Sequence, residues 1–374
     1  MESTFITELG DAFGDTGELV TGVRLNGYVI EKRLGQGGLG AVYLARHEVL
    51  DTLFALKVLD PKMAEDKPEY VTRFVREAKL ASRIRHPNLV AVHDAGYDEK
   101  LGIYYLVMDY VQGSTLRQAI ALGGAMPCAE ASRVVLQVAS ALQAAQRFGM
   151  VHRDIKPENI MIMQDGNVKL IDLGVAKVAE EMDNLKTMEN SVFGTISYVS
   201  PEQATDASRV DIRADIYSLG IVFFEMLSGR LPYKDKDPGT IILELMSPAP
   251  LPDVREFNPD VPPEISALVR KMCAKKPEDR LSSPNLLIET LVNLGYKVGT
   301  SEDVEYVETE SDRSFAAATV LSGAADDALT LDTQDTEMQA FVKGIKRRRL
   351  LGRLAWIAAA LGVVITLLIL FLFV

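Results

Sequence analysis

The sequence predicts an α+β fold of two lobes, a small β-rich lobe and a larger helical lobe, followed by one C-terminal transmembrane helix. Three observations predict it. Short runs rich in β-branched and aromatic residues, separated by glycine turns, dominate residues 28–111. Between residues 128 and 293, apolar residues mostly recur at helical spacing. Residues 354–374 carry no charged side chain and, as a helix, are long enough to cross the hydrocarbon core of a bilayer.

The charge of the chain is unevenly placed. The 374 residues carry a formal net charge of −12, which argues against nucleic-acid binding because such proteins usually present a basic face. Residues 301–340 hold eleven acidic side chains and one basic one, whereas residues 343–353 hold six basic ones and no acidic one. The two cysteines, Cys128 and Cys273, are far apart in the sequence and indicate neither a disulfide framework nor a metal site.

These patterns divide the chain into five segments. Residues 1–23 have neither the basic start nor the apolar middle of a signal peptide. Residues 295–342 lack sustained periodicity, which is typical of disorder. The predicted segments are a mobile N-terminal arm over residues 1–23, a folded domain over residues 24–294, an acidic disordered linker over residues 295–342, a basic juxtamembrane segment over residues 343–353 and a transmembrane helix over residues 354–374.

A glycine-rich turn joins two predicted strands near the start of the domain. Gly35, Gly37 and Gly40, with Val42 after them, form the pattern G-x-G-x-x-G-x-V. Dinucleotide-binding domains use a similar pattern, but there a helix follows the turn, whereas here a β-branched and aromatic strand follows it. A hairpin tip without side chains can lie close to a polyphosphate and donate backbone N–H groups to it. We therefore expect phosphate binding at this turn.

The next predicted strand, TLFALKVLD, is apolar except for Lys57. A charged group in such a strand needs a partner, or it lies at an edge where its ammonium reaches water. The helix predicted after it, over roughly residues 69–85, offers Glu77 beside an apolar stripe. A Lys57–Glu77 ion pair is one interpretation, and an exposed edge lysine is the other.

The stretch HRDIKPENIMIMQDGNVKLIDLG, which begins at His152, concentrates several polar groups. Its apolar runs predict two short strands joined by the turn QDGN. Asp154, Lys156 and Asn159 precede the first strand and Asp172 follows the second, so the hairpin should bring them together. Carboxylate and amide oxygens suit hard cations. These residues alone predict a site for metal and phosphate.

HRDxxxxN followed by D-x-G, with the glycine turn and the lysine–glutamate pair before it, resembles the eukaryotic-type (Hanks-type) serine/threonine protein kinases of bacteria. The resemblance covers residues 24–294 and implies the two-lobed protein kinase fold, with ATP and two Mg²⁺ ions, which Mn²⁺ can replace. It implies that Asp154 orients the acceptor hydroxyl, that Lys156 neutralises charge on the transferred group and that Lys57 binds the α- and β-phosphates. The implied catalytic residues are Asp154, Lys156, Lys57 and Glu77, and the implied metal ligands are Asn159 and Asp172.

The resemblance also implies how the adenine is held. Backbone groups of a hinge over residues 109–111 would read the adenine edge. The family more often has glutamate at the position of Asp109, a mild change because the backbone makes these contacts. The residues implied to bind ATP are Leu34, Gly35, Gly37, Gly40, Val42, Ala55, Lys57, Met108, Asp109, Val111 and Met161.

The acceptor is implied to be a serine or threonine of a protein substrate. Lys156 within DIKPEN and Thr195 within GTxxYxSPE both resemble serine/threonine kinases. Arg153 implies control by a phosphate on the following loop, where Thr187 is favoured over Ser191. The other interpretation of these hydroxyls is an unmodified, solvated loop. The implied regulatory residues are Arg153, Thr187, Ser191 and Thr195.

Three further expectations concern structural contacts. Glu202 of the SPE triplet is implied to pair with Arg280 of KPEDR. Asp215, at the start of an apolar helix, is implied to cap that helix and to tie the catalytic loop. The histidines at positions 47, 86 and 93 have no ligand-like neighbours and are expected to be structural or solvated.

The C-terminal segments predict a membrane location. The basic residues before the transmembrane helix place the domain on the cytoplasmic side, where we expect a single-pass, autophosphorylating kinase in signalling. Thr309, with Asp312 three residues on, resembles a ligand for forkhead-associated domains. The resemblance also implies a homodimer through the small lobe.

Two competing interpretations stay open. One is a nucleotide-binding scaffold without turnover. The other is a small-molecule kinase of similar fold, which GTxxYxSPE disfavours because it resembles a platform for protein substrates.

Overall fold

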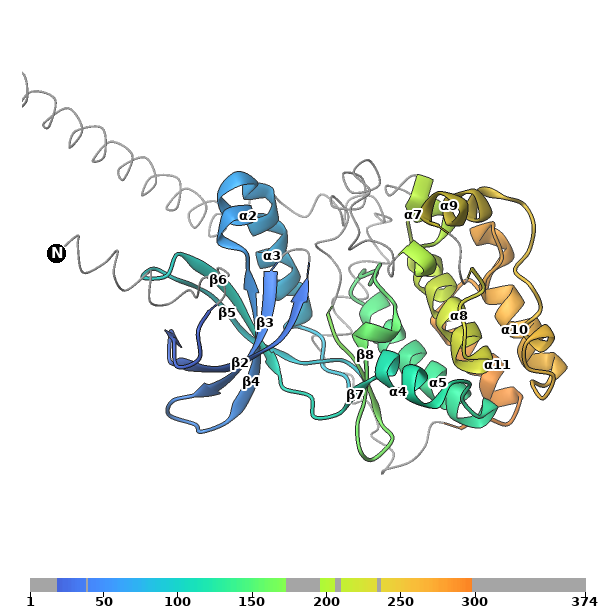
Figure 1. Ribbon diagram of the computed structural model, residues 1–374, viewed down its shortest axis with the longest axis horizontal. Helices are drawn as coiled ribbons and strands as arrows, with labels where there is room; N and C mark the ends of the chain where they lie inside the picture. The colour runs from blue at the N-terminus through green and yellow to red at the C-terminus, as the bar shows by residue number, and fades with distance from the viewer. Residues whose placement is uncertain (1–18, 38–39, 173–195, 206–209, 234–236, 298–374) are drawn as a thin grey trace, which may run out of the picture. The chain divides into compact units, whose positions relative to one another are not determined.

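The computed structural model describes residues 19–37, 40–172, 196–205, 210–233 and 237–297, apart from the side chains of Arg73, Glu77 and Pro238 (Figure 1). Within these residues, no helix combines the length and the apolar character that a bilayer crossing requires. The predicted transmembrane helix, the basic segment before it and residues 298–342 of the predicted linker lie outside this part of the chain.

The first lobe consists of a six-stranded antiparallel sheet, with strand order β1-β2-β3-β4-β6-β5, and two helices. It confirms the predicted β-rich lobe, and the hairpin at the glycine turn pairs Gly37 with Gly40. The elements are β1 (Arg24–Leu25), β2 (Tyr28–Gly37), β3 (Gly40–His47), β4 (Leu53–Leu59), α2 (Pro61–Asp66), α3 (Pro68–Ala81), β5 (Val92–Asp98) and β6 (Ile103–Asp109).

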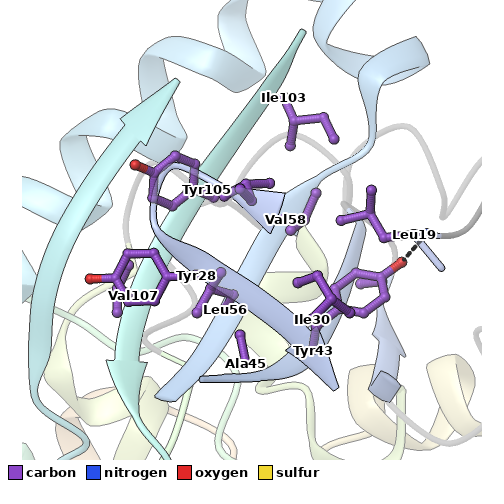
Figure 2. Packing of buried hydrophobic residues seen from close by; sticks show 12 residues of the cluster. Leu19, Tyr28, Ile30, Tyr43, Ala45, Leu56, Val58, Ile103, Tyr105 and Val107 are labelled. Carbon is purple, nitrogen blue, oxygen red and sulfur yellow. Dashed lines mark hydrogen bonds between the residues drawn. The ribbon is translucent and has the colours of Figure 1, made fainter. Parts of the chain in front are cut away.

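Alternation along the strands divides this sheet into two faces. Ala41, Tyr43 and Ala45 of β3 lie on one face with Leu56 and Val58 of β4, in an apolar cluster that also includes side chains of β2 and β6 (Figure 2). The residues that alternate with them point to the opposite face. That second face carries four of the positions at which nucleotide binding was predicted, Val42, Ala55, Lys57 and Met108.

The folded domain begins earlier than the sequence predicted. We expected a mobile arm up to residue 23, but Leu19 is buried in the cluster and its backbone N–H donates to Tyr43 Oη at 3.1 Å (Figure 2). The N–H of Gly22 donates to Ile30 O at 2.8 Å, and Val23 packs against the cluster. The apolar Leu19 and Val23 anchor a segment whose composition is otherwise polar. Residues 1–18 lie outside the described chain.

The second lobe is mainly helical, as predicted, with one small sheet of order β7-β8-β9. The β8–β9 hairpin forms over the predicted QDGN turn, where Met163 N donates to Asn167 O at 2.9 Å. The elements are β7 (Ser114–Thr115), α4 (Leu116–Gly123), α5 (Cys128–Gln146), η1 (Pro157–Asn159), β8 (Ile160–Ile162), β9 (Val168–Leu170), η4 (Ile196–Tyr198), α7 (Pro201–Thr205), α8 (Ile212–Ser228), α9 (Pro238–Met246), η6 (Val254–Glu256), α10 (Pro263–Met272), η7 (Pro277–Asp279) and α11 (Pro284–Asn293).

Helix α8 forms the centre of this lobe (Figure 1). Every residue from 214 to 227 is buried, and α5 and α10 pack on the helix. A helix that is apolar nearly all round is stable only inside a core. Its N-cap is Asp211, whose carboxylate accepts a hydrogen bond from Arg213 N at 2.9 Å. The predicted capping role of Asp215 is therefore wrong, because this residue lies in the first turn of the helix and its carboxylate binds elsewhere.

The segment after α3 joins the two lobes through backbone pairing. Leu89 and Leu170 form an isolated parallel bridge, with Val90 N donating to Leu170 O at 3.0 Å and Leu170 N to Asn88 O at 2.8 Å. The Asn88 side chain, itself buried, donates to Gln137 Oε1 of α5 at 2.8 Å. These contacts attach the β8–β9 hairpin to residues 88–90, between α3 and β5, and so set the position of the residues that follow β9.

Candidate active site

The loop between α5 and β8 gathers three of the predicted catalytic and metal-binding residues. The Asp154 carboxylate is buried, and Lys156 Nζ lies 3.0 Å from its Oδ2. Asn159 Nδ2 donates to the same oxygen at 2.8 Å and to the backbone oxygen of Asp154 at 2.9 Å. The ammonium of Lys156 and the amide of Asn159 therefore fix the position of the Asp154 carboxylate. These residues follow Asp154 by only two and five positions, and η1 turns the chain so that they meet.

Asp215 of α8 binds the backbone at the start of this loop. Its carboxylate oxygens accept hydrogen bonds from the backbone N–H groups of His152 and Arg153, both at 2.7 Å. Arg153 has a φ of +64°, a left-handed conformation that is strained for a non-glycine residue. Burial raises the pKa of Asp215 to about 7, although the two N–H groups favour the carboxylate form. The predicted tie between this residue and the loop is confirmed.

Asp172 is brought back to the loop by the β8–β9 hairpin. Ile171 N donates to Asn159 O at 2.8 Å, which places the chain after β9 beside the metal-binding asparagine of the sequence prediction. Asp172 also adopts a positive φ of +62°. Its Oδ1 forms an ion pair with Lys57 Nζ of β4, a residue of the other lobe. The structure thus brings together Lys57, Asp172 and the loop of Asp154.

The ligand types at this site fit a hard cation bound together with phosphate. Asn159 uses Nδ2 toward Asp154, so its amide oxygen is the atom that could bind a metal, and Asp172 adds a carboxylate. Among the residues that the structure describes, no three His, Cys, Asp or Glu side chains gather as a metal site. Mg²⁺ typically takes one or two protein ligands and completes its octahedron with phosphate and water.

The predicted partner of Lys57 is only partly placed. Glu77 lies in α3, as expected from the periodicity, but its side chain is outside the described part of the structure. The edge-lysine interpretation is wrong, because β4 lies between β3 and β6 and only 14% of the Lys57 side chain is exposed.

The register of the sheet places four predicted nucleotide-binding residues on one face. Val42 of β3 pairs with Lys57 of β4, and Ala55 of β4 pairs with Met108 of β6. Directly paired residues in antiparallel strands point to the same side, as do residues two apart in one strand. The remaining predicted positions are described as follows: Leu34, Gly35 and Gly37 are exposed on β2, Met161 is half-buried in β8, and Val111 is half-buried after β6.

Gly40 has a structural requirement that the sequence did not reveal. Its φ is +148°, and a Cβ there would lie 1.9 Å from Val58 O of β4. A side chain at this position would therefore collide with backbone, whatever the hairpin binds. By contrast, a Cβ at Gly35 would meet nothing within 4 Å, and its absence is not required by packing.

The side chain of Asp109 has contacts that sequence reasoning missed. Its Oδ1 lies 2.6 Å from His93 Nε2 of β5, and its Oδ2 lies 3.5 Å from Lys169 Nζ of β9. Lys169 also donates to Leu89 O at 3.3 Å. Burial alone would raise the pKa of Asp109, but the His93 hydrogen bond and the Lys169 charge outweigh burial and lower it. The Asp109 carboxylate thus connects β5 of the first lobe to β9 of the second lobe.

The predicted regulatory residues are mostly outside the described chain. Thr187, Ser191 and Thr195 fall in residues 173–195, of which the structure describes nothing. Arg153 is described: its backbone O accepts a hydrogen bond from Gln203 Nε2 of α7 at 3.0 Å. Gln203 therefore connects the SPE segment to the catalytic loop, a role that no motif indicated.

The fold and this loop define a protein kinase, and comparison with known proteins agrees. The protein kinase domain family matches residues 28–292. The chain belongs to this family, and the predicted resemblance to bacterial Hanks-type serine/threonine protein kinases is confirmed.

Named relatives come from several bacteria. Serine/threonine-protein kinase PrkC of Bacillus subtilis is 40% identical over 263 residues, which are 70% of this chain and 40% of the relative. Serine/threonine-protein kinase PknB of Mycobacterium tuberculosis is 35% identical over 326 residues, 86% of this chain and 51% of the relative. The chain thus spans about half or less of the length of these relatives. The crystal structure of the M. tuberculosis PknI kinase domain is similar with a TM-score of 0.58 and 31% identity, over 74% of this chain and 99% of that one.

Proposed function

We propose that this chain transfers the γ-phosphate of ATP to serine and threonine hydroxyls of proteins. The observation that carries the proposal is the Asp154 carboxylate, positioned by Lys156 and Asn159, with the Lys57–Asp172 pair beside the same loop. Phosphoryl transfer needs positioning and neutralisation of charge more than covalent catalysis. These five side chains provide both.

Each residue has a distinct task in this proposal. Asp154 accepts the hydrogen bond of the incoming hydroxyl and orients it, while Lys156 neutralises charge on the transferred group. Lys57 binds phosphate oxygens of ATP, with Glu77 as its proposed second partner. Asp172 and Asn159 would hold Mg²⁺ or Mn²⁺, which would neutralise charge on the phosphates of ATP. Adenine packs on the sheet face that carries Val42, Ala55 and Met108.

Transfer to a protein hydroxyl can be tested with the purified full chain in detergent, ATP labelled in the γ-phosphate, Mg²⁺ and a generic acceptor protein. We expect phosphoserine or phosphothreonine in the acceptor. Asp154→Asn should reduce the rate by about 10²–10⁴-fold, the range for loss of a positioned acid–base group. Asp165→Asn makes the same chemical change in the exposed β8–β9 turn and is the matched control. A chain that binds ATP but labels no protein would support the scaffold interpretation instead.

The regulatory part of the proposal concerns autophosphorylation. Thr187 and Ser191 are the proposed phosphorylation sites, with Thr187 favoured, and the Arg153 guanidinium is the proposed phosphate ligand. Mass spectrometry of the protein after incubation with MgATP would map the phosphates. A Thr187→Ala variant that retains full activity and loses no regulation would contradict this assignment.

A membrane anchor is proposed for residues 354–374, with the basic residues 343–353 on the cytoplasmic face. The support is the composition of these segments, uncharged and then strongly basic. Fractionation of cells that express the full chain and a chain ending at residue 342 tests it, and equal distribution of the two would contradict it.

Two partner proposals also come from the sequence. Phosphorylated Thr309 is proposed to bind a forkhead-associated domain, and the small lobe is proposed to form a homodimer. Binding of a Thr309 phosphopeptide to such a domain tests the first proposal, and sedimentation of the domain over residues 19–297 tests the second.

A further inference from the structure

A network of four side chains connects elements that are far apart in the sequence. Arg117 of α4 donates through Nε to Glu158 Oε1 at 2.7 Å and through Nη1 to Glu225 Oε1 of α8 at 2.6 Å. Its Nη2 donates to the hydroxyl of Tyr198 in η4. Tyr198 in turn donates to Glu225 Oε2 at 2.5 Å. One guanidinium therefore contacts three different elements.

The network lies next to the loop that carries Asp154. Glu158 lies in η1, two residues after Lys156 and next to Asn159. Tyr198 lies in the segment that precedes the SPE triplet, and its backbone oxygen accepts a hydrogen bond from Ser218 Oγ of α8 at 2.7 Å. Arg117 thus contacts both the loop that carries Asp154, through Glu158, and the segment over residues 196–200, through Tyr198.

Charge and burial make this arrangement specific to arginine. The side chain of Glu225 is only 5% exposed, and within the described chain Glu158 Oε2 is buried without a hydrogen-bond partner. Burial lowers the pKa of Arg117, but Tyr198 and the two carboxylates outweigh burial and raise it, so the guanidinium stays charged. A planar guanidinium can donate to three acceptors in fixed directions, whereas the ammonium of lysine is a compact point charge.

We propose that Arg117 is a positioning residue that locks the segment over residues 196–200 to the catalytic loop, and that it thereby sets how efficiently a protein acceptor is used. The inference rests on the proposed function, since it concerns the acceptor side of that reaction. In the proposed function, ATP lies on the other side of the site, against Lys57 and the sheet. Loss of Arg117 should accordingly change the use of the acceptor and leave nucleotide binding intact.

The first test compares Arg117→Lys with the wild type in steady-state kinetics on the full chain, varying the acceptor protein and ATP separately. We expect kcat/KM for the acceptor to fall about tenfold or more, as for small misplacements of reacting groups, while KM for ATP stays within about twofold. Arg213→Lys is the matched control, because Arg213 has the same 32% side-chain exposure and forms a 2.6 Å ion pair with Asp211, the N-cap of α8. The inference would be overturned if kcat/KM for the acceptor did not fall, or if KM for ATP rose by the same factor as kcat/KM for the acceptor fell.

A second variant separates positioning from stability. Arg117→Met alone leaves Glu225 as a buried unpaired charge, whereas Arg117→Met with Glu225→Gln removes both charges. We expect the double variant to recover the melting temperature but not kcat/KM for the acceptor. Recovery of both would show a purely structural role and overturn the inference. If the wild type transfers no phosphate to protein, the proposed function itself fails, and the inference fails with it. If the wild type is active but the variants behave otherwise than expected, only the inference fails.

Discussion

Glu202 and Arg280 form a two-pronged ion pair in which Nη1 lies 2.6 Å from Oε1 and Nη2 lies 2.8 Å from Oε2. The Arg280 side chain is 0% exposed. It also donates to three backbone oxygens, those of residues 213, 274 and 275, at 2.7 to 3.1 Å. This confirms the pairing expected from the SPE and KPEDR motifs. The pair ties α7 to the start of α8 and to the segment before α11.

Replacing Arg280 by methionine should strongly destabilise the domain. Glu202 would remain as a largely buried carboxylate, and three backbone oxygens would lose their donor. Breaking a buried pair in this way typically costs about 3–5 kcal/mol. Urea unfolding of residues 19–297 measures the change.

Arg270→Met is the control for that variant. Arg270 also forms a 2.6 Å ion pair, with Asp253, but its side chain is 54% exposed. Exposed pairs contribute at most about 1 kcal/mol. Equal destabilisation by the two substitutions would contradict the importance of burial at Arg280.

Replacing Asp215 by asparagine should reduce turnover. In the wild type, His152 N and Arg153 N each donate to one oxygen of the Asp215 carboxylate. Asparagine has only one acceptor oxygen, so its amide nitrogen would face one of these two N–H donors. The left-handed turn at Arg153 would lose part of its support, and Asp154 would shift. We expect kcat to fall by about 10²-fold, the scale of a misplacement of about 1 Å.

Asp211→Asn provides a matched comparison in the same helix. Asp211 is the N-cap of α8, and asparagine caps helices about as well as aspartate does. Its kinetic constants should stay close to those of the wild type. If Asp215→Asn behaves in the same way, the backbone contacts of Asp215 do not set the position of Asp154.

The stability of the domain should depend on His86 at acidic pH. Burial, with the charges of Arg147 and Lys169, lowers the pKa of His86 to about 4, below its ordinary value of 6.5. Its Nδ1 accepts a hydrogen bond from Asn88 N at 3.2 Å, and its Nε2 lies 3.1 Å from Ser140 Oγ. Because the folded state favours the neutral ring, the contribution of His86 is complete above pH 6.5 and is lost as the pH falls toward 4.

Thermal melts between pH 4 and 7.5 measure this dependence. His86→Asn keeps an acceptor near Asn88 N but does not titrate. We expect the melting temperature of the wild type to fall more steeply than that of the variant below pH 6.5. Parallel curves would contradict the assignment of this transition to His86.

Removing Lys169 should weaken ATP binding moderately. Lys169 connects β9 to the hinge through Asp109 and Leu89 O, and its replacement by methionine leaves the Asp109 carboxylate with His93 as its ionic partner. A partly exposed ion pair contributes about 0.2–1 kcal/mol, so the Kd for ATP should rise by less than about fivefold. Calorimetry measures the Kd, and Lys271→Met on the exposed side of α10 is the control. An unchanged Kd would mean that the hinge geometry does not need this contact.

Local patterns predicted the parts of the site that lie close together in the sequence. Asp154, Lys156 and Asn159 meet within one short loop, and the QDGN hairpin folds back as expected, so strand and turn chemistry were sufficient there. Two predictions failed at residues where a long-range contact decided the outcome. Leu19 was assigned to a mobile arm because its neighbours are polar, yet Tyr43, 24 residues away, holds its backbone. Asp215 was assigned as a cap because helix starts favour such residues, yet its carboxylate faces the catalytic loop.

The sequence by itself determined the family and the order of the elements, because motifs and periodicities are local. The Glu202–Arg280 pair was expected from two motifs, but other ion pairs between residues far apart in the sequence were decided by the tertiary structure. Arg117 meets partners that are 41, 81 and 108 residues away, and no spacing along the chain indicates that. Lys57 and Asp172 are 115 residues apart and come from different lobes. Such contacts depend on how the helices and the sheet pack, because burial, which makes a charge need its partner, exists only in the folded chain.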